Sequence, residues 1–551
     1  MRLDQYFRPF CTPARAAALT LALFGSGMPL SAFGQPPAQA PTQPPAIPTT
    51  QSPQPVVQGT PITADDAVRM ALENNLGVQE ERLNPQIASL GIARAAGAFA
   101  PQIVSSVLRS NSAAPPSDFL STAGVSGGGA AVVTSGNFQT QAGVQQVLRW
   151  TGANYTFSWD GSRSTTDAPR TVFSPELSSH LNLTATQPLL RNFRIDAFRQ
   201  QLLLSRTTSD IADLGLQQRI TQTTRNVRAA YYSLTGAIAG LNVAQQSLDL
   251  ARQQLKQNQT RVDVGTMAPI DIVAAEAEVA SNEEGVIVQQ AAIETAQDQL
   301  RALLMNPSQP DFWTARFTPA EQPTLSPESI DVEAAVRTAL TNRTDLLQFK
   351  KQMEQTDINM RYAANQKLPG VDLQARYGLQ GIGGTQYAYD NAAIASGAAP
   401  VPSSSSVRPF ADVLRDVFGN NFKTWTVQVN VSYPLGTSAA DAAYAQAKLQ
   451  KQQQATTLTD LEMQITTQVR EAARQVQTNL RRVEATRKAR ELAEKRLEAE
   501  QKRFQVGLNS TFELFQAQRD LAAARNAELN STIAYNLALV DFQAVQHAPI
   551  R

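Results

Sequence analysis

Hydrophobic residues recur at every seventh position along two long stretches of the chain, and the second stretch repeats the first at a shift of 242 positions. The first row is Ile220, Val227, Leu234, Leu241, Leu248, Leu255 and Val262, and the second is Val469, Val476, Val483, Leu497 and Phe504. Only Arg490 interrupts the second row. A strict seven-residue repeat keeps one apolar seam facing a partner and supercoils helices left-handedly. The pattern predicts long coiled-coil helices.

Each row is broken once by a Val-Gly pair and then resumes. The breaks lie in RVDVGTMAPIDI (261–272) and RFQVGLNSTFEL (503–514). The resumed rows are Ile272, Val279, Val286, Ile293 and Leu300 in the first copy and Leu514, Leu521, Glu528, Tyr535 and Phe542 in the second. Glycine allows a helix to end and the chain to reverse. The sequence therefore predicts two antiparallel helical hairpins, the first with an arm over roughly 195–262 that is on the order of 100 Å long.

The segments before the hairpins are also duplicated. TADDAVRMALENN (63–75) matches DVEAAVRTALTNR (331–343) at a shift of 268, whereas TATQPLLR (184–191) matches VNVSYPLG (429–436) at a shift of 246. The first copy thus has 22 extra residues in a Gly/Ser/Ala-rich region, which predicts a longer loop. We expect a first structural repeat over 60–306, a linker over 307–330 and a second repeat over 331–547.

Four segments alternate apolar and polar residues. They are NYTFSWD (154–160), HLNLTATQ (180–187), VDLQARYGLQ (371–380) and TWTVQVNVSY (424–433). Period two predicts strands with one apolar face, as in outer-membrane barrels and equally in half-buried soluble sheets. Four strands cannot close a membrane barrel, because known barrels begin near eight strands and open edges are excluded from hydrocarbon. If these strands lie in a membrane, several chains must share one barrel.

The N-terminal residues predict export. Arg2, Arg8 and Arg15 precede the apolar run AAALTLALF (16–24), and Ala32-Phe33-Gly34 is a small-x-small cleavage site. We expect a secretory signal peptide over 1–34 and an extended Pro/Gln-rich tether over 35–59. The only cysteine, Cys11, would be removed with the signal, so the exported chain would contain no disulfide.

Charge and composition exclude several classes of function. Removal of the signal leaves 45 basic (48 − 3) and 46 acidic (47 − 1) residues, a balance that argues against a nucleic-acid binder. The chain after the signal has no run of about 18 apolar residues that would predict a membrane-spanning helix. His180 and His547 are the only histidines and lack the spacing of metal ligands. We expect no catalytic residues, no cofactor and no metal, and hence no enzyme.

The duplicated unit resembles the TolC family of outer-membrane efflux proteins over nearly the whole chain after the tether. The resemblance rests on the two copies of helices, strand pair and long hairpin, on TQPLLR (186–191), and on RFQVGLNSTFELFQAQRDLAAARN (503–526) with its paired Val-Gly tip. It implies a mainly α fold with a membrane β-barrel. Three chains, each a two-repeat chain of coiled-coil hairpins plus four strands, would form a trimeric 12-strand barrel and a periplasmic α-helical tunnel.

The same resemblance implies a function and partners. The homotrimer would lie in outer-membrane lipid, extend into the periplasm and act as the passive channel-tunnel of a tripartite efflux or type I secretion system. It would dock to a periplasmic adaptor and an inner-membrane pump. The residues implied for adaptor docking form the two hairpin tips: Val264, Gly265, Thr266, Val506, Gly507 and Leu508.

The resemblance also assigns pore and gate positions. The family's two acidic selectivity positions fall on Glu513 and Gln516, so only one carboxylate ring would remain. Three Glu513 side chains around the axis would favour cations, with weaker selectivity and weaker block by multivalent cations than two rings give. The family's closing contacts join an acid to a tyrosine and an arginine, and the corresponding residues here are Asp271, Phe504 and Asn509. We expect a different or weaker closure.

Two other readings fit part of the pattern. An exported coiled-coil scaffold or fibre protein without a channel would explain the heptads, but not aromatic-rich strand faces in both copies. A periplasmic adaptor would also contain a long helical hairpin, but would not duplicate the strand-and-hairpin unit.

Overall fold

The computed structural model of the chain describes residues 59–115, 132–167, 171–321, 330–389, 402–436 and 438–546. The predicted signal peptide, nearly all of the predicted tether, residues 322–329 of the predicted linker and His547 lie outside these ranges. All described residues belong to one compact unit.

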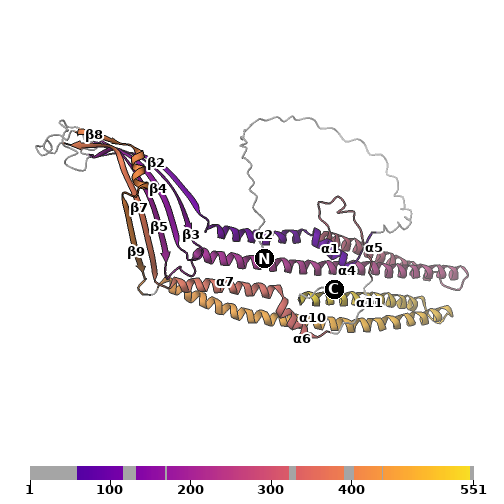
Figure 1. Cartoon of the computed structure of the whole chain (residues 1–551). Helices are drawn as coiled ribbons and strands as arrows, with labels where there is room; N and C mark the ends of the chain where they lie inside the picture. Colours follow the sequence, from indigo (N-terminus) through magenta and orange to yellow (C-terminus); the bar gives the residue numbers. More distant parts are fainter. Residues whose placement is uncertain are drawn as a thin grey trace, which may run out of the picture. The chain divides into compact units, whose positions relative to one another are not determined.

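Two long hairpins dominate the helical part of the fold (Figure 1). Their long arms are α4 (Ala197–Asp263) and α10 (Ala439–Gln505), with 67 residues each. Their return arms are α5 (Ile270–Leu304) and α11 (Thr511–Val545), with 35 residues each. At about 1.5 Å per residue each long arm extends on the order of 100 Å. The predicted hairpins are confirmed, and the arm expected over 195–262 matches α4 to within two residues.

The heptad rows form the seam of each hairpin, as predicted. No residue of either row is exposed, and Val227, Leu234, Val469 and Val476 are almost completely buried. Full burial of such a side chain contributes about 1.5–3 kcal/mol. The seams continue into clusters around Tyr231 in the first hairpin and Tyr535 in the second.

Within the described residues, no helix combines the length and the apolar character that crossing a bilayer would take.

A short strand and two helices precede the sheet in each repeat. They are β1 (Thr60–Ile62), α1 (Ala64–Asn74) and α2 (Leu76–Gly97), and then β6 (Phe317–Pro319), α6 (Val332–Asn342) and α7 (Thr344–Gln366). Thr63 and Asp331 cap α1 and α6 by accepting hydrogen bonds from backbone N–H groups of the first turn. β1 and β6 pair in parallel, which joins the start of the described chain to the segment expected as a linker.

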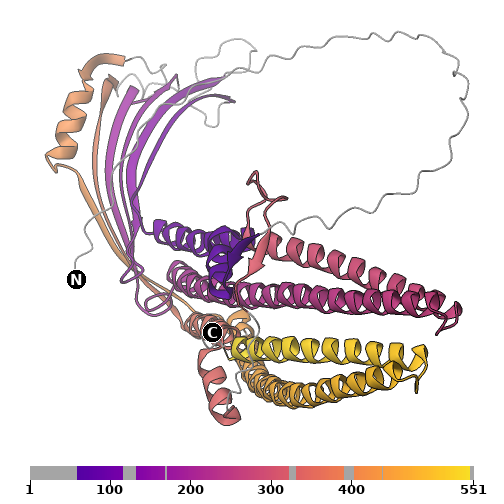
Figure 2. The same ribbon diagram turned by 90° about the vertical axis from the view of Figure 1, so that its right-hand side faces the viewer.

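The remaining strands form one antiparallel sheet (Figure 2). They are β2 (Gln102–Ala114), β3 (Val133–Val147), β4 (Asn154–Thr166), β5 (Phe173–Pro188), β7 (Gly370–Tyr389), β8 (Pro402–Arg408) and β9 (Lys423–Ser432). The order is β2-β3-β4-β5-β7, and β8 and β9 share the outer edge of β7. β9 pairs with residues 370–379 of β7, and β8 pairs with residues 384–389.

The prediction of four strands per chain is wrong, because the described sheet has seven. The first repeat contributes four long strands rather than two. The segment 133–147, part of the region expected as a longer loop, is β3. β2 and β3 are rich in Ser, Gly, Ala and Gln, so they carry almost no period-two hydrophobic signal. Backbone pairing over 13 register positions on each side of β3 forms these strands instead. A barrel of twelve strands from three chains does not follow from this sheet.

The two faces of the sheet differ in polarity, as the alternation predicted. One register row crosses all six long strands as Ile103, Val144, Phe157, Leu183, Tyr377 and Trp425. The next row, on the opposite face, is Gln102, Gln145, Thr156, Thr184, Arg376 and Thr426. Successive residues of a strand point to opposite faces, so one face is apolar and the other polar.

A short amphipathic helix, α9 (Phe410–Phe418), packs on the apolar face. It lies between β8 and β9 in the chain and contacts β7 and β5 through the fully buried Val413 and Val417. A Cβ at position 381 would lie 2.3 Å from the carbonyl oxygen of Val413, so Gly381 is required for this approach. Gly381 shares a face with Tyr377, four residues earlier on β7, which assigns α9 to the apolar side.

Candidate functional site

Both hairpins reverse through the same helix-ending motif. In the first, Thr266 N–H donates to the Arg261 carbonyl at 2.8 Å and Gly265 N–H donates to the Val262 carbonyl at 2.9 Å. In the second, Leu508 and Gly507 donate to the equivalent carbonyls at 2.9 and 3.2 Å. The glycines have φ of +76° and +77°. These paired bonds satisfy the last carbonyls of each long helix and need a left-handed residue, which explains the repeated Val-Gly.

The tips are apolar and exposed. We call the residues 264–273 and 506–516 the tip region. Five large apolar side chains of this region are each at least 67% exposed, and they are Val264, Ile270, Val506, Leu508 and Phe512. Several large apolar side chains exposed at the end of a helical hairpin are typical of a contact surface. The six residues predicted for docking all lie here, and Thr266 is exposed as well.

Glu513 lies in the first turn of α11. Its Oε2 accepts hydrogen bonds from the Ser510 N–H at 3.1 Å and from the Ser510 Oγ–H at 3.5 Å. The carboxylate thus supports the start of the helix, where a negative charge is favourable, while the side chain remains exposed. Glu513 can therefore hold the helix terminus and present charge to solvent.

Gln516 is half-buried and already engaged. Its amide donates to Asp520 Oδ1 at 2.9 Å, and Asp520 also pairs with Arg496 of α10 at 2.7 Å. The side chain thus belongs to a polar contact between the two arms of the second hairpin. It supplies no charge at the position three residues from Glu513.

Met267 of the first tip packs against the apolar cluster of the second hairpin that contains Phe504 and Leu514. Two further contacts between the tips involve polar groups. Thr511 Oγ1–H donates to Asp271 Oδ1 at 2.7 Å. The Arg261 guanidinium lies 4.7 Å from the centroid of the buried Phe504 ring, and its Nη1 donates to the Phe504 carbonyl at 3.4 Å. A cation over an aromatic face is worth about 0.5–1 kcal/mol at an exposed site and more when desolvated. We call these two contacts the tip contacts.

The structure brings only part of the expected closing set together. Asp271 and Phe504 both join the two hairpins, through Thr511 and Arg261, which sequence reasoning did not select. Asn509 donates instead to Glu500 of its own hairpin. No sequence pattern marks Arg261 or Thr511, because their partners lie about 240 residues away.

Two heptad positions of the second copy hold charged residues, Arg490 on α10 and Glu528 on α11, and their side chains meet in the middle of the second hairpin. Arg490 Nε lies 2.5 Å from Glu528 Oε2, and Arg490 Nη1 lies 3.0 Å from Glu494 Oε2. Burial alone would raise the pKa of Glu494, but hydrogen bonds and charge from Arg490 and then Arg525 outweigh it and hold that pKa below its usual value. At this level of the second hairpin, an ion pair between α10 and α11 replaces the apolar contact of the heptad seam.

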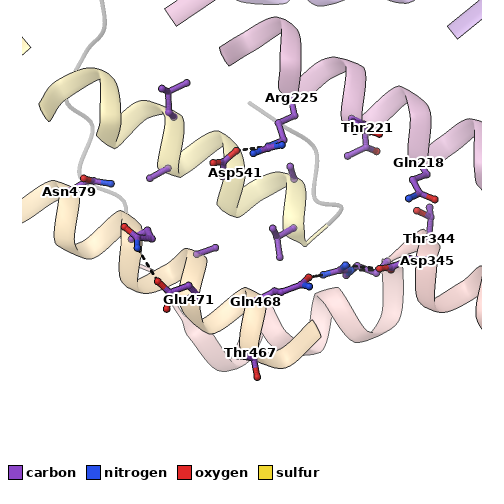
Figure 3. Close-up of a pocket in the computed structure, with 18 of the residues that line it drawn as sticks. Gln218, Thr221, Arg225, Thr344, Asp345, Thr467, Gln468, Glu471, Asn479 and Asp541 are labelled. Carbon is purple, nitrogen blue, oxygen red and sulfur yellow. Dashed lines mark hydrogen bonds and ion pairs between the residues drawn. The ribbon is translucent and has the colours of Figure 1, made fainter. Parts of the chain in front are cut away.

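A hollow of about 960 Å³ lies where the two repeats meet (Figure 3). Its lining comes from α4, α7, α10 and α11. Figure 3 shows Arg225 of α4 in contact with Asp541 of α11, a pair separated by 2.5 Å. On the other side, Arg343 binds Asp345 at 2.6 Å and Gln468 of α10 at 2.7 Å. The Arg225–Asp541 pair joins the first hairpin to the second, whereas Arg343 joins the start of α7 to α10 within the second repeat. Among the described residues, no three His, Cys, Asp or Glu side chains cluster as metal ligands.

Comparison with known proteins identifies the duplicated unit. The model of a family described as "Outer membrane efflux protein" matches residues 139–305 and 335–545, which together exceed half of the chain. No curated protein matches the chain in the sequence comparison.

Solved structures share the fold at low sequence identity. The Campylobacter jejuni CmeC outer membrane channel is 15% identical with a TM-score of 0.60, and the match covers 88% of this chain and 85% of that one. Vibrio cholerae VceC, an outer membrane protein, is 14% identical with a TM-score of 0.58, covering 89% and 97%. The open state of the Neisseria gonorrhoeae MtrE outer membrane channel is 14% identical with a TM-score of 0.59, covering 92% and 98%.

The two matched stretches contain most of the sheet and both helical hairpins, and the fold is shared with solved channels over 85–98% of their length. The expected family, outer-membrane location and efflux class are thereby confirmed. The chain belongs to the outer membrane efflux protein family, whose members are outer-membrane channels that extend into the periplasm.

Proposed function

We propose that three copies of this chain form a passive conduit in which the sheets cross the outer membrane and the helical hairpins enclose a tunnel through the periplasm. The length of the hairpins carries the proposal, because arms on the order of 100 Å exceed what a compact domain needs. The polar and apolar faces of the sheet suit a lumen and a lipid surface respectively. Energy for transport would come from an inner-membrane pump.

The tip region is the proposed docking site for a periplasmic adaptor. Val264 and Val506 occupy equivalent places in the two repeats, and both are exposed, as is Leu508. Six such tips in a trimer would present apolar side chains around one opening. An adaptor with its own helical hairpin could cover them and remove this apolar area from water.

The proposed periplasmic opening would be lined by one carboxylate ring. Three exposed Glu513 side chains would favour cations, and Gln516 adds no second ring because it is neutral and bound to Asp520. The tip contacts are the proposed closing device. Separation of the hairpin tips would break the Thr511–Asp271 hydrogen bond and lift Arg261 from Phe504. These few contacts, with Met267 packed beside them, are weak individually, which suits a closure that an adaptor can open.

Site-specific photo-crosslinking in the native host tests the docking. A photoreactive residue at position 508 should capture a periplasmic protein with a long helical hairpin, identified by mass spectrometry. The matched control is position 463, where Met463 is also exposed on α10 but lies about 60 Å from the tip by helix rise. Capture of that adaptor at 463 and not at 508 would contradict tip docking.

A fractionation experiment tests the conduit against the scaffold alternative. An outer-membrane conduit should stay in the membrane pellet in alkaline carbonate and be released by detergent. Release by carbonate alone would favour a peripheral scaffold and would remove the basis for the conduit.

A further inference from the structure

Six strands of each chain have the length to cross a membrane. β2, β3, β4, β5, β7 and β9 contain between 10 and 20 residues each, against about 9–11 for a tilted membrane strand. β8 has seven residues and pairs with the far end of β7, on the same edge as β9. It therefore adds no further strand to the width of the sheet. The sheet is continuous across all six strands, because every adjacent pair is joined over at least ten register positions.

The two outer strands of this sheet have free edges. In the part of the chain that the structure describes, β2 pairs only with β3, and β9 pairs only with β7. Every residue of β2 and of β9 is exposed, whereas the strands between them are partly covered. A membrane does not tolerate unpaired backbone N–H and C=O groups, so both edges require a partner.

A second copy of the same chain fits both edges. β2 follows α2 and runs away from the helices, whereas β9 leads into α10 and runs toward them. β9 of one copy is therefore antiparallel to β2 of the next when both hairpins point the same way. The apolar register row ends at Ile103 on β2 and at Trp425 on β9, so pairing that keeps this face outward, with the register stagger that barrel closure requires, would continue one apolar surface around the assembly.

The polar face is open on the lumen side of such an assembly. α9 covers the apolar face, at Gly381 and Gly383. On the polar face, Arg376 donates to Asn182 Oδ1 at 3.2 Å, and Asn182 donates to Asp160 Oδ2 at 3.2 Å. This hydrogen-bonded row crosses β7, β5 and β4, and within the described residues no helix packs over it.

We infer that the outer edge of β9 binds β2 of the next copy and that three copies of six strands close an eighteen-strand barrel. This inference rests on the trimer of the proposed function. The barrel would be wider than the twelve strands that four per chain would give. Barrel diameter grows roughly linearly with strand number, so the lumen would be about 1.5 times as wide, in the range where barrels hold an aqueous channel. The β3–β4 hairpin is thus a size determinant of the outer opening.

Engineered disulfides test the edge pairing in the full chain in native membranes. The polar-face residues Gln102, Ser106 and Ser110 of β2 and Thr424, Thr426 and Gln428 of β9 are replaced by cysteine in nine pairwise double variants, because barrel closure staggers the two edges. We expect one of them to give covalent dimers and a closed covalent trimer on oxidation. The control pair Thr156→Cys and Thr184→Cys joins register partners within one chain and should give no intermolecular ladder. Absence of a ladder in all nine β2–β9 variants would overturn the pairing.

Electron microscopy of the detergent-purified protein counts strands and copies. Three copies around an eighteen-strand wall are expected. A trimer with a twelve-strand wall and the β3–β4 hairpin outside it, or a dimer that closes twelve strands from two copies, would overturn the inference. The twelve-strand trimer would leave the proposed conduit intact, whereas a protein without any closed membrane wall would refute the conduit as well.

Discussion

The charge bridge in the second hairpin gives a prediction with a defined sign. Arg490 occupies a heptad position where the first hairpin has Leu248, and Glu528 occupies one where the first hairpin has Val286. Replacing Arg490 by Leu restores the apolar row on one arm. It also leaves Glu528, which is 25% exposed, without its partner at 2.5 Å. We expect Arg490→Leu alone to destabilise the chain and Arg490→Leu with Glu528→Val to recover the loss.

The magnitude follows from the burial of the pair. Breaking a fully buried ion pair costs about 3–5 kcal/mol, and an exposed pair is worth about 0.2–1 kcal/mol. With both side chains about one quarter exposed, an intermediate cost of about 1–2 kcal/mol is expected for Arg490→Leu. The double variant removes both charges from the seam and adds apolar burial, so it should be as stable as the wild type or more stable.

Urea unfolding of the detergent-purified full chain, followed by circular dichroism at a helical wavelength, measures the difference. The matched control is Glu498→Gln, which removes the exposed pair with Lys502 on the same helix and should leave the midpoint unchanged. If the double variant were no more stable than Arg490→Leu, the loss in the single variant would not come from the unpaired Glu528, and the reasoning would fail.

Three further predictions concern the tips and the seam. Gly507→Ala places a Cβ in the left-handed region at φ +77° and should cost about 1 kcal/mol, seen as faster proteolytic cleavage at the second tip, although the space around it is open. Thr511→Val removes the hydrogen bond to Asp271 and should raise the open fraction in single-channel recordings, whereas Thr511→Ser should not; equal open fractions would remove Thr511 from the closure. Arg490 and Arg525 lower the pKa of Glu494 in the folded chain, so its carboxylate should stabilise the fold above about pH 4.3, the ordinary value for Glu. This stabilisation should be lost as the pH falls through the lowered pKa. A Glu494→Gln variant whose urea midpoint falls with acid as steeply as that of the wild type would contradict this.

The hairpins were predictable because long helices leave a periodic signal. Seven-residue rows extend over both arms, and the paired glycines mark both turns, so sequence alone gave the bounds of α4 to within two residues. The meeting of Arg490 and Glu528 was also within reach, since the two interruptions lie 17 and 21 residues from Gly507 on opposite arms.

The sheet was only half predictable, for a physical reason. β4, β5, β7 and β9 alternate large apolar and polar side chains, whereas β2 and β3 carry mostly small or amide side chains on both faces. Pairing of the backbone with neighbouring strands holds such strands, and single-strand patterns do not report it. The tip contacts were not predictable either, because Arg261 and Phe504 meet only when two hairpins lie side by side.

Single-channel recording of the detergent-purified full chain in planar bilayers tests the central claim most directly. Wild-type protein should insert as discrete conducting steps with a preference for cations, and Glu513→Gln should lower that preference while it keeps the steps. Steps with an unchanged preference would remove Glu513 from the opening. Folded, membrane-extracted protein that never conducts would contradict the channel itself.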